Sequence, residues 1–187
     1  TELLPSEAVH QGFAALVEPL PKVYLEDVIS FTKLQTRATI LVLDRITDPH
    51  NVGAIMRSAS VFGADAVIIS DRHAPPVNGI LAKASSGAIE TTPLVRVTNV
   101  VRAIKSLQKK GFWCIGLDSD AELPLEDVKP SPFQIIALGA EGPGLRRLTR
   151  EACDTMCRIR SSSPISSLNV SNAAAVTLFS LNRLRQN

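Results

Sequence analysis

The sequence of 187 residues is poor in aromatic side chains, which make up 4% of it, and contains three cysteines. With so few aromatic residues, valine, isoleucine, leucine and alanine must form most of the core. Cys153 and Cys157 lack the CxxC spacing of zinc and redox sites, and His10, His50 and His73 are scattered. We therefore expect structural thiols and no metal site. Sparse cysteine is also typical of a reducing compartment, so we expect a cytoplasmic protein.

Long apolar runs and a one-sided charge are lacking as well. No stretch approaches the roughly 18 consecutive apolar residues of a membrane span, and no signal-peptide pattern opens the sequence. We therefore expect no association with a membrane. The formal net charge is +2, from 20 basic and 18 acidic residues. Any contact with nucleic acid must then come from local basic patches, because the whole chain carries no electrostatic signature for it.

From about Arg37 onward, short apolar runs alternate with helical patterns. Several of these runs are apolar at consecutive positions, as expected for parallel strands that are covered on both faces. The alternation predicts an α/β fold in which helices flank a parallel sheet. The predicted strands are Ile40–Leu43, Ala66–Ile69, Leu94–Val97, Phe112–Leu117, Gln134–Leu138 and Met156–Ile159.

Three helices are predicted from apolar residues at helical spacing. They cover residues 52–62, residues 100–107 and, at the end of the sequence, roughly residues 169–185. Polar residues that favour helix starts, and a glycine that favours a helix stop, flank them. The expected caps are Asn51 for the first helix and Thr98 or Asn99 for the second, with Gly111 as its stop.

Residues 1–36 have a different character from the rest. Pro5, Pro19 and Pro21 interrupt them, and the segment is too small for a core of its own. We expect residues 1–36 to be a linker or the remnant of a further domain, and residues 37–187 to form the main domain.

Three polar clusters follow predicted strands, at the edge where open α/β sheets bind ligands. In the first, Asn51 opens a helix and Arg57 lies about 9 Å further along the helix axis. Its side chain leans back toward the helix N-terminus and can reach the same end as Asn51. An arginine on an alanine- and serine-rich helix is costly unless it meets an anionic partner. The alternative is that Asn51 is a plain cap and Arg57 a solvated residue.

The second cluster is the glycine-rich stretch 139–145, Gly-Ala-Glu-Gly-Pro-Gly-Leu. Glycines let the backbone turn tightly and approach a ligand. The stretch is neither GxGxxG nor GK[ST], and it lies in the last third of the chain, which disfavours a nucleotide-binding dehydrogenase and a phosphate-binding loop. Glu141 is either a carboxylate at a helix start or an active-site group.

The third cluster, residues 164–172, contains Ser166, Ser167 and Asn169 before an apolar helix. Serine and asparagine are good N-caps, so capping alone accounts for part of the cluster. The number of small polar groups nevertheless exceeds what one cap needs.

Together the three clusters resemble, in order and spacing, the three motifs of the SpoU/TrmH family of SPOUT RNA methyltransferases. The resemblance covers roughly Thr39 to Arg185. It is strongest for the bacterial subgroup that methylates a guanosine ribose 2′-oxygen in large-subunit ribosomal RNA, which residues 48–51, 93–99 and 146–151 resemble. The matching motifs are Asn51 with Arg57, Gly139-x-Glu141-Gly142-x-Gly144 and Ser167-Leu168-Asn169-Val170-Ser171.

The resemblance implies a SPOUT-type fold, with a parallel sheet flanked by helices and a C-terminal trefoil knot, in a homodimer. It also implies S-adenosyl-L-methionine as cofactor, held mainly by backbone groups. In one departure, Arg160-Ser161-Ser162-Ser163 replaces the Pro-Met and following glycine that the family usually has after Ile159. The residues expected to bind the cofactor are Leu117, Asp118, Leu138, Gly139, Gly144, Ile159, Ser167 and Leu168.

The implied reaction is in-line displacement, in which the ribose 2′-oxygen attacks the sulfonium methyl. The resemblance gives Arg57 the central role, assisted by Asn51, Glu141, Ser167 and Asn169. Because an arginine side chain stays protonated, we favour positioning and electrostatic stabilisation over proton abstraction by Arg57. The residues expected to meet RNA are Arg45, Arg57, Arg146, Arg147 and Arg150.

Two further functions remain open at this point. A tRNA ribose methyltransferase has the same catalytic motifs, although residues 1–36 favour the ribosomal substrate. A non-catalytic RNA-binding protein can keep the same fold. The presence of Arg57, Glu141 and Asn169 weighs against it, and failure to bind the cofactor would support it.

Overall fold

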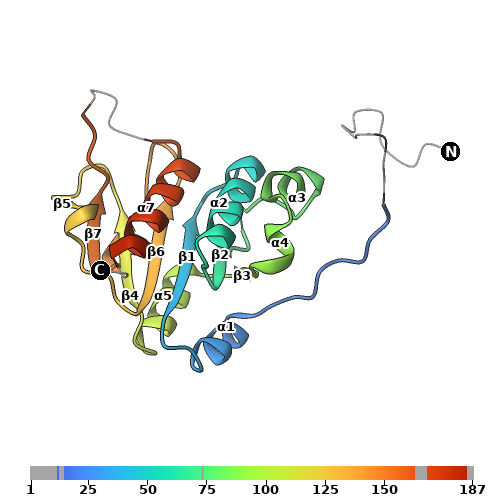
Figure 1. Cartoon of the computed structure of the whole chain (residues 1–187), viewed down its shortest axis with the longest axis horizontal. Coiled ribbons are helices and arrows are strands. Elements are labelled where there is room, and N and C mark those ends of the chain that lie inside the picture. Colours follow the sequence, from blue (N-terminus) through green and yellow to red (C-terminus); the bar gives the residue numbers. More distant parts are fainter. Residues whose placement is uncertain (1–11, 13–14, 73, 163–167, 185–187) are drawn as a thin grey trace.

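The computed structural model describes residue 12 and residues 15–72, 74–162 and 168–184. Its centre is a seven-stranded sheet in which all neighbouring strands are parallel. The order across the sheet is β3-β2-β1-β6-β4-β7-β5, so β6 lies between β1 and β4 (Figure 1). The strands are β1 (Ala38–Asp44), β2 (Ala66–Ser70), β3 (Leu94–Val97), β4 (Trp113–Leu117), β5 (Leu123–Pro124), β6 (Phe133–Gly139) and β7 (Thr155–Arg158).

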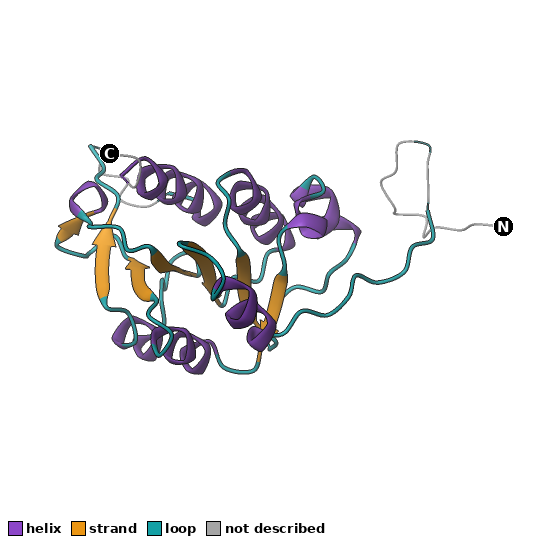
Figure 2. Cartoon of the chain, turned by 60° about the horizontal axis from the view of Figure 1, so that its bottom comes forward, coloured by secondary structure: helices purple, strands orange, loops and turns teal. Residues whose placement is uncertain are grey.

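Helices cover both faces of the sheet, as Figure 2 shows. One face carries α2 (Pro49–Val61), α3 (Gly79–Ser85), α4 (Ala88–Thr91) and α7 (Val170–Leu184). The other carries α1 (Leu25–Thr32), α5 (Val100–Gln108) and the short α6 (Arg147–Glu151). A 3-10 turn, η1 (Leu125–Asp127), follows β5.

The first strand explains why its sequence is apolar without alternation. Leu41 and Leu43 belong to the core under α2 and α7, whereas Ile40 and Val42 belong to the core under α1 and α5. Since successive side chains of a strand point to opposite faces, both faces of the sheet need apolar residues. The predicted α/β fold with a parallel sheet flanked by helices is therefore confirmed.

All six predicted strands are present; Leu94–Val97 matches β3 at both ends, and the ends of the others differ by at most two residues. The two-residue strand β5 was not predicted. The second predicted helix is present as α5, with Asn99 accepting a hydrogen bond from the Arg102 amide, and Gly111 follows it with a φ of +91°. The prediction of Asn51 as a cap is wrong, because α2 begins at Pro49 and Asp48 is its N-cap. The Asp48 side chain accepts a hydrogen bond from the His50 amide (2.9 Å).

The segment 1–36 contributes α1 to the helix layer that also contains α5 and α6, where Val28 is buried against the strands. Residues 15–22 are exposed and extend away from the sheet (Figure 1). The trefoil knot stays a prediction, and residues 163–167 lie outside the described residues. Within the described part of the chain, none of the helices combines the length and apolar character that a bilayer crossing requires.

Candidate functional site at the carboxyl end of the sheet

Three of the predicted catalytic side chains meet at the carboxyl end of the sheet. Glu141 follows β6, Asn51 lies in the first turn of α2, and Asn169 directly precedes α7. The Asn169 amide nitrogen donates to Glu141 Oε1 (2.6 Å) and to Asn51 Oδ1 (3.0 Å), and Asn51 Nδ2 donates to the same Glu141 oxygen (3.3 Å). Residues far apart in the sequence thus form one polar cluster, which the motif spacing alone does not require.

Asn169 shows that capping and site chemistry are compatible in one side chain. Its Oδ1 accepts hydrogen bonds from the backbone amide (2.9 Å) and hydroxyl (2.5 Å) of Ser171 in the first turn of α7. Its Nδ2 remains available for Glu141 and Asn51. Because the helix start fixes the oxygen end of the amide, the nitrogen end points in a defined direction at Glu141.

Arg57 lies on α2, six residues after Asn51, and its side chain is exposed. Among the described residues, no carboxylate forms an ion pair with it. A guanidinium with five donors is therefore open to a ligand. Ser167, the remaining predicted catalytic residue, lies outside the described residues.

A cavity of about 820 Å³ opens beside the cluster. Glu141 and Asn169 line it, together with seven of the eight residues predicted to bind a cofactor; the eighth, Ser167, is not described. The sequence reasoning missed other lining residues, including Asp120, Arg160 and Ala173. The seven predicted residues are Leu117, Asp118, Leu138, Gly139, Gly144, Ile159 and Leu168.

The glycine-rich loop after β6 folds back on itself at the wall of this cavity. The Gly144 amide donates to the Ala140 carbonyl (2.9 Å), and Gly144 has a φ of +66°. A Cβ on Gly139 would lie 2.1 Å from the Gly144 carbonyl carbon and 2.2 Å from the Leu145 nitrogen. Only a glycine fits at position 139, because those contacts involve backbone atoms that cannot move aside.

The predicted RNA-binding arginines fall into two groups. Arg45 and Arg57 are exposed, and among the described residues neither has a carboxylate partner; Arg45 has a left-handed backbone with a φ of +60°. The other three arginines, which follow the glycine-rich loop, are all paired. Arg146 binds the fully buried Asp44, Arg147 binds Glu151 at 2.6 Å, and Arg150 binds Asp118.

The three cysteines lie in and next to β4 and β7, with Cys157 in the core on one face of the sheet and Cys114 and Cys153 in the core on the other. The Cys114 thiol donates to Cys153 Sγ (3.7 Å), and this hydrogen bond together with burial raises the pKa of Cys114. Burial, followed by the nearby Cys153, raises the pKa of Cys157 to about 12. Both thiols therefore stay protonated near neutral pH and are poor nucleophiles. Among the described residues, no three histidine, cysteine or acidic side chains are grouped as a metal site.

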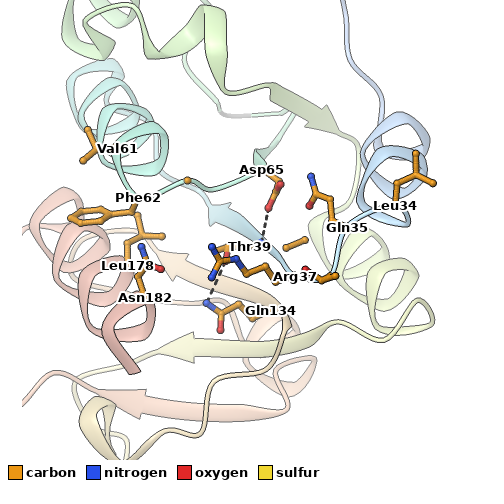
Figure 3. A pocket seen from close by; sticks show the side chains of 13 residues that line it. Leu34, Gln35, Arg37, Thr39, Val61, Phe62, Asp65, Gln134, Leu178 and Asn182 are labelled. Carbon is orange, nitrogen blue, oxygen red and sulfur yellow. Dashed lines mark hydrogen bonds between the residues drawn. The ribbon is translucent and has the colours of Figure 1, made fainter. Parts of the chain in front are cut away.

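A second cavity, of about 690 Å³, lies at the opposite, amino end of the strands (Figure 3). Its polar lining residues are tied to the strand starts: Asp65 accepts from the Thr39 amide (2.7 Å), and Gln134 Nε2 donates to Thr39 Oγ1 (3.5 Å). Gln134 is 2% exposed and its Oε1 has no partner among the described residues. None of the predicted site residues lies here.

A parallel α/β sheet with a cavity and a convergent polar cluster at the carboxyl ends of its strands defines a ligand-binding α/β protein. The chain belongs to the SpoU rRNA Methylase family, whose profile matches residues 38–179. The predicted family resemblance is therefore confirmed.

Two relatives and one solved structure illustrate the similarity. The chain is 42% identical over 178 residues to the 23S rRNA (guanosine-2'-O-)-methyltransferase RlmB of Vibrio cholerae, which covers 95% of this chain and 72% of that protein. It is 41% identical over 183 residues to the RlmB of Pseudomonas putida, covering 96% and 73%. The crystal structure of the SpoU methyltransferase AviRb from Streptomyces viridochromogenes, in complex with AdoMet, matches with a TM-score of 0.75 at 27% identity. That match covers 82% of this chain and spans 60% of the AviRb chain.

Proposed function

We propose that this chain transfers a methyl group from S-adenosyl-L-methionine to a ribose 2′-hydroxyl of ribosomal RNA, with a guanosine of the large-subunit RNA as the preferred nucleotide. The names of its relatives support the substrate. The observation that carries the proposal is the Asn51–Glu141–Asn169 cluster at the mouth of the 820 Å³ cavity. A ribosomal substrate also supports a cytoplasmic location.

The cavity suits the proposed cofactor in size and chemistry. Small-molecule sites usually measure about 300–1,000 Å³ and combine apolar walls with a few placed polar groups. Leu117, Leu138, Ile159 and Leu168 supply apolar side chains, and the glycine-rich loop supplies backbone polar groups. The AviRb structure, which contains AdoMet, supports this assignment. We therefore propose that the predicted cofactor residues, including the undescribed Ser167, hold S-adenosyl-L-methionine.

When bound, S-adenosyl-L-methionine would supply a methyl group on a sulfonium centre, and in-line attack of the RNA 2′-oxygen on the methyl carbon would release the thioether S-adenosyl-L-homocysteine. Arg57 holds a substrate phosphate and stabilises the negative charge that develops on the 2′-oxygen. Arg57 does not accept the 2′-hydroxyl proton, because its guanidinium stays charged; the substrate phosphate that Arg57 holds takes up this proton. Asn51 and Asn169 hold Glu141 by their amide donors and thereby fix the polar edge on which the ribose lies. Ser167 assists at the same edge.

Of the five arginines predicted to meet RNA, we propose Arg45 and Arg57 as the main contacts, because their surroundings differ from those of the other three. Arg45 and Arg57 have no carboxylate partner among the described residues, so their full charge is available to phosphates. Removing one such contact should reduce the slope of log affinity against log salt concentration by about one. Arg146, Arg147 and Arg150 share their charge with carboxylates and are weaker candidates.

A homodimer is proposed as well. Val61 of α2 and Val176 and Phe179 of α7 are exposed apolar residues on the same face of the sheet. The Phe62 and Phe179 rings pack edge to face with centroids 6.2 Å apart, so the helices present one continuous apolar surface. Phe179→Glu should shift the sedimentation coefficient from dimer to monomer, whereas Tyr24→Glu, at the exposed start of α1, should not. A wild-type monomer at high concentration would contradict the proposal.

The domain division is proposed as expected from the sequence, with residues 1–36 as a linker or remnant and residues 37–187 as the catalytic domain. The alignment with the Vibrio cholerae relative leaves part of that longer protein unmatched, which supports it.

Calorimetric titration of the purified chain with S-adenosyl-L-methionine and, separately, with NAD tests the class of enzyme. We expect binding of the first and not of the second. Transfer of a labelled methyl group to large-subunit ribosomal RNA and to tRNA, followed by mass spectrometry of the digested RNA, then tests the substrate. Methylation of tRNA alone would identify the tRNA enzyme, and a folded chain that does not bind the cofactor would identify a non-catalytic RNA-binding protein.

A further inference from the structure

The N-cap residue of α6, Arg146, and Arg150 within α6 follow the glycine-rich loop and bind carboxylates at the ends of the strands on both sides of β6. Asp44 is the last residue of β1, and its Cα is in register with Gly139 at the end of β6. Asp118 follows the last residue of β4. Since β6 lies between β1 and β4, these two carboxylates flank the start of the loop that carries Glu141.

Asp44 binds both the backbone and the side chain of Arg146. Its carboxylate accepts from the Arg146 amide (3.1 Å) and Nε (2.7 Å), and Nη2 lies 2.7 Å from the same carboxylate. The Asp44 side chain is 0% exposed, and that of Asp118, which pairs with Arg150, is 6% exposed. Arg146 is the N-cap of α6, and Arg150 lies within the helix four residues further on. Arg147 and Glu151 form a third pair that is fully at the surface.

Both carboxylates are buried, whereas the Arg146 and Arg150 side chains are 43% and 48% exposed. An ion pair with a buried member is weak evidence for stability, because apolar side chains of similar volume are often as stabilising. Its value lies in fixed geometry, since an arginine fork meets a carboxylate in only a few arrangements. Here the geometry defines where the loop 139–145 ends relative to β1 and β4. The loop carries Glu141 and forms a wall of the cavity. The positions of its two ends therefore determine the position of Glu141 and the shape of that wall.

We infer that Arg146 and Arg150, held by Asp44 and Asp118, are positioning residues for the glycine-rich loop rather than RNA contacts. The two ion pairs clamp the loop between β1 and β4 and thereby hold Glu141 against Asn51 and Asn169. This inference rests on the proposed function for its catalytic readouts. It also requires that loss of either pair impairs methyl transfer while RNA affinity is kept.

Arg146→Lys and Arg150→Lys separate the two roles, because lysine keeps the positive charge that a phosphate needs but cannot form the fork. We expect kcat to fall about 10- to 100-fold in either variant, in line with the effect of a small misplacement at a reacting centre. The dissociation constant for RNA and its salt dependence should stay at the wild-type values. A fall in RNA affinity with an unchanged kcat would overturn the inference.

Asp44→Asn tests the same clamp from the buried side, without touching an arginine. It should lower kcat as Arg146→Lys does, while RNA affinity is unchanged or tighter, because Arg146 is then released. Tighter RNA binding with a wild-type kcat would identify Arg146 as an RNA contact. The matched control is Glu151→Gln, which removes a carboxylate from an exposed pair on the same helix and should leave all rates at wild-type values.

Hydrogen exchange of the loop amides, above all of Gly144, gives a readout that needs neither cofactor nor RNA. Exchange should accelerate in Arg146→Lys, Arg150→Lys and Asp44→Asn and stay unchanged in Glu151→Gln. If the wild type binds no cofactor but the loop loosens as expected, the proposed function fails and the clamp stands. If wild-type activity is present and the loop exchanges normally in all variants, the clamp is wrong. Should Asp44→Asn not fold, as thermal unfolding would show, the two lysine variants decide the question.

Discussion

The two ends of the parallel sheet carry cavities of comparable size, about 820 Å³ at the carboxyl end and about 690 Å³ at the amino end. Both have polar linings, and each can be matched with an exposed arginine: Arg37 lines the amino-end cavity, and Arg57 lies on α2, six residues after Asn51. They differ in where the polar groups come from. At the carboxyl end, Asn51, Glu141 and Asn169 converge from three distant segments. At the amino end, polar side chains bond to the starts of neighbouring strands.

The comparison shows that cavity volume does not identify a functional site. The amino-end hydrogen bonds connect strands that the sheet already places together, so they add little beyond the fold. The carboxyl-end cluster joins the first turn of α2, the loop after β6 and the residue before α7, which strand pairing alone does not bring together. Polar groups that converge without a structural need point to chemistry.

The largest expected difference between the two ends concerns their arginines. Arg57→Ala should lower kcat for methyl transfer about 10²- to 10³-fold, because it removes a charge from the developing oxyanion. The thermal midpoint should hardly change, since Arg57 is exposed. Arg37→Ala, the counterpart at the amino end, should keep wild-type kcat. Steady-state kinetics with labelled cofactor measures kcat of both variants. Equal values of kcat would contradict the assignment of the catalytic site to the carboxyl end of the sheet.

A smaller difference is expected for the glycines. Gly139→Ala puts a Cβ into backbone atoms, and a strained loop of this kind costs about 1–3 kcal/mol, or about 5- to 150-fold in cofactor affinity. Gly63, at the amino end, has a φ of +68°, but a Cβ at this position would meet no atom within 4 Å. Gly63→Ala should therefore cost only about 1 kcal/mol of stability through its left-handed backbone. Calorimetry and denaturant unfolding distinguish the two losses. Wild-type cofactor affinity in Gly139→Ala would show that the loop does not shape the cavity.

The smallest effect is expected from the unpartnered amide at the amino end. Gln134→Leu removes a buried Oε1 without a partner among the described residues and a long hydrogen bond to Thr39. These losses nearly offset each other, so the free energy of unfolding should change by less than about 1 kcal/mol. Cofactor binding should not change. A large loss of cofactor affinity, measured by the same titration, would mean that the amino end communicates with the site.

The sequence predicted the sheet well because its strands are apolar runs with buried residues on both faces, as in β1 and β6. It did not predict α1, α3, α4 or α6, which are only four to eight residues long and too short to show helical periodicity. Most of the cavity lining followed from the family motifs. The pairing of Arg146 with Asp44 did not, because it depends on the order of strands across the sheet, which no local pattern encodes.

Asn51 illustrates the same limit on a smaller scale. An asparagine ahead of an apolar stretch is a good cap, but Asp48 and Pro49 provide an equally good start one turn earlier. The capping preferences of the residue types do not decide between Asp48 and Asn51 as the N-cap of α2. With the cap supplied by Asp48, the Asn51 side chain is left for the polar cluster.

The pairing of β1 with β6 at the centre of the sheet joins segments 95 residues apart, and the Asn51–Asn169 contact joins residues 118 apart. Such non-local contacts form late, because the entropy of closing a long loop must be overcome before they stabilise anything. A chain emerging from the ribosome can pair β1 with β2 early, yet it cannot assemble the polar cluster until Asn169 and the start of α7 are available. A nascent chain that lacks Asn169 and α7 is therefore not catalytically competent. Competence is acquired late in folding, when the polar cluster forms.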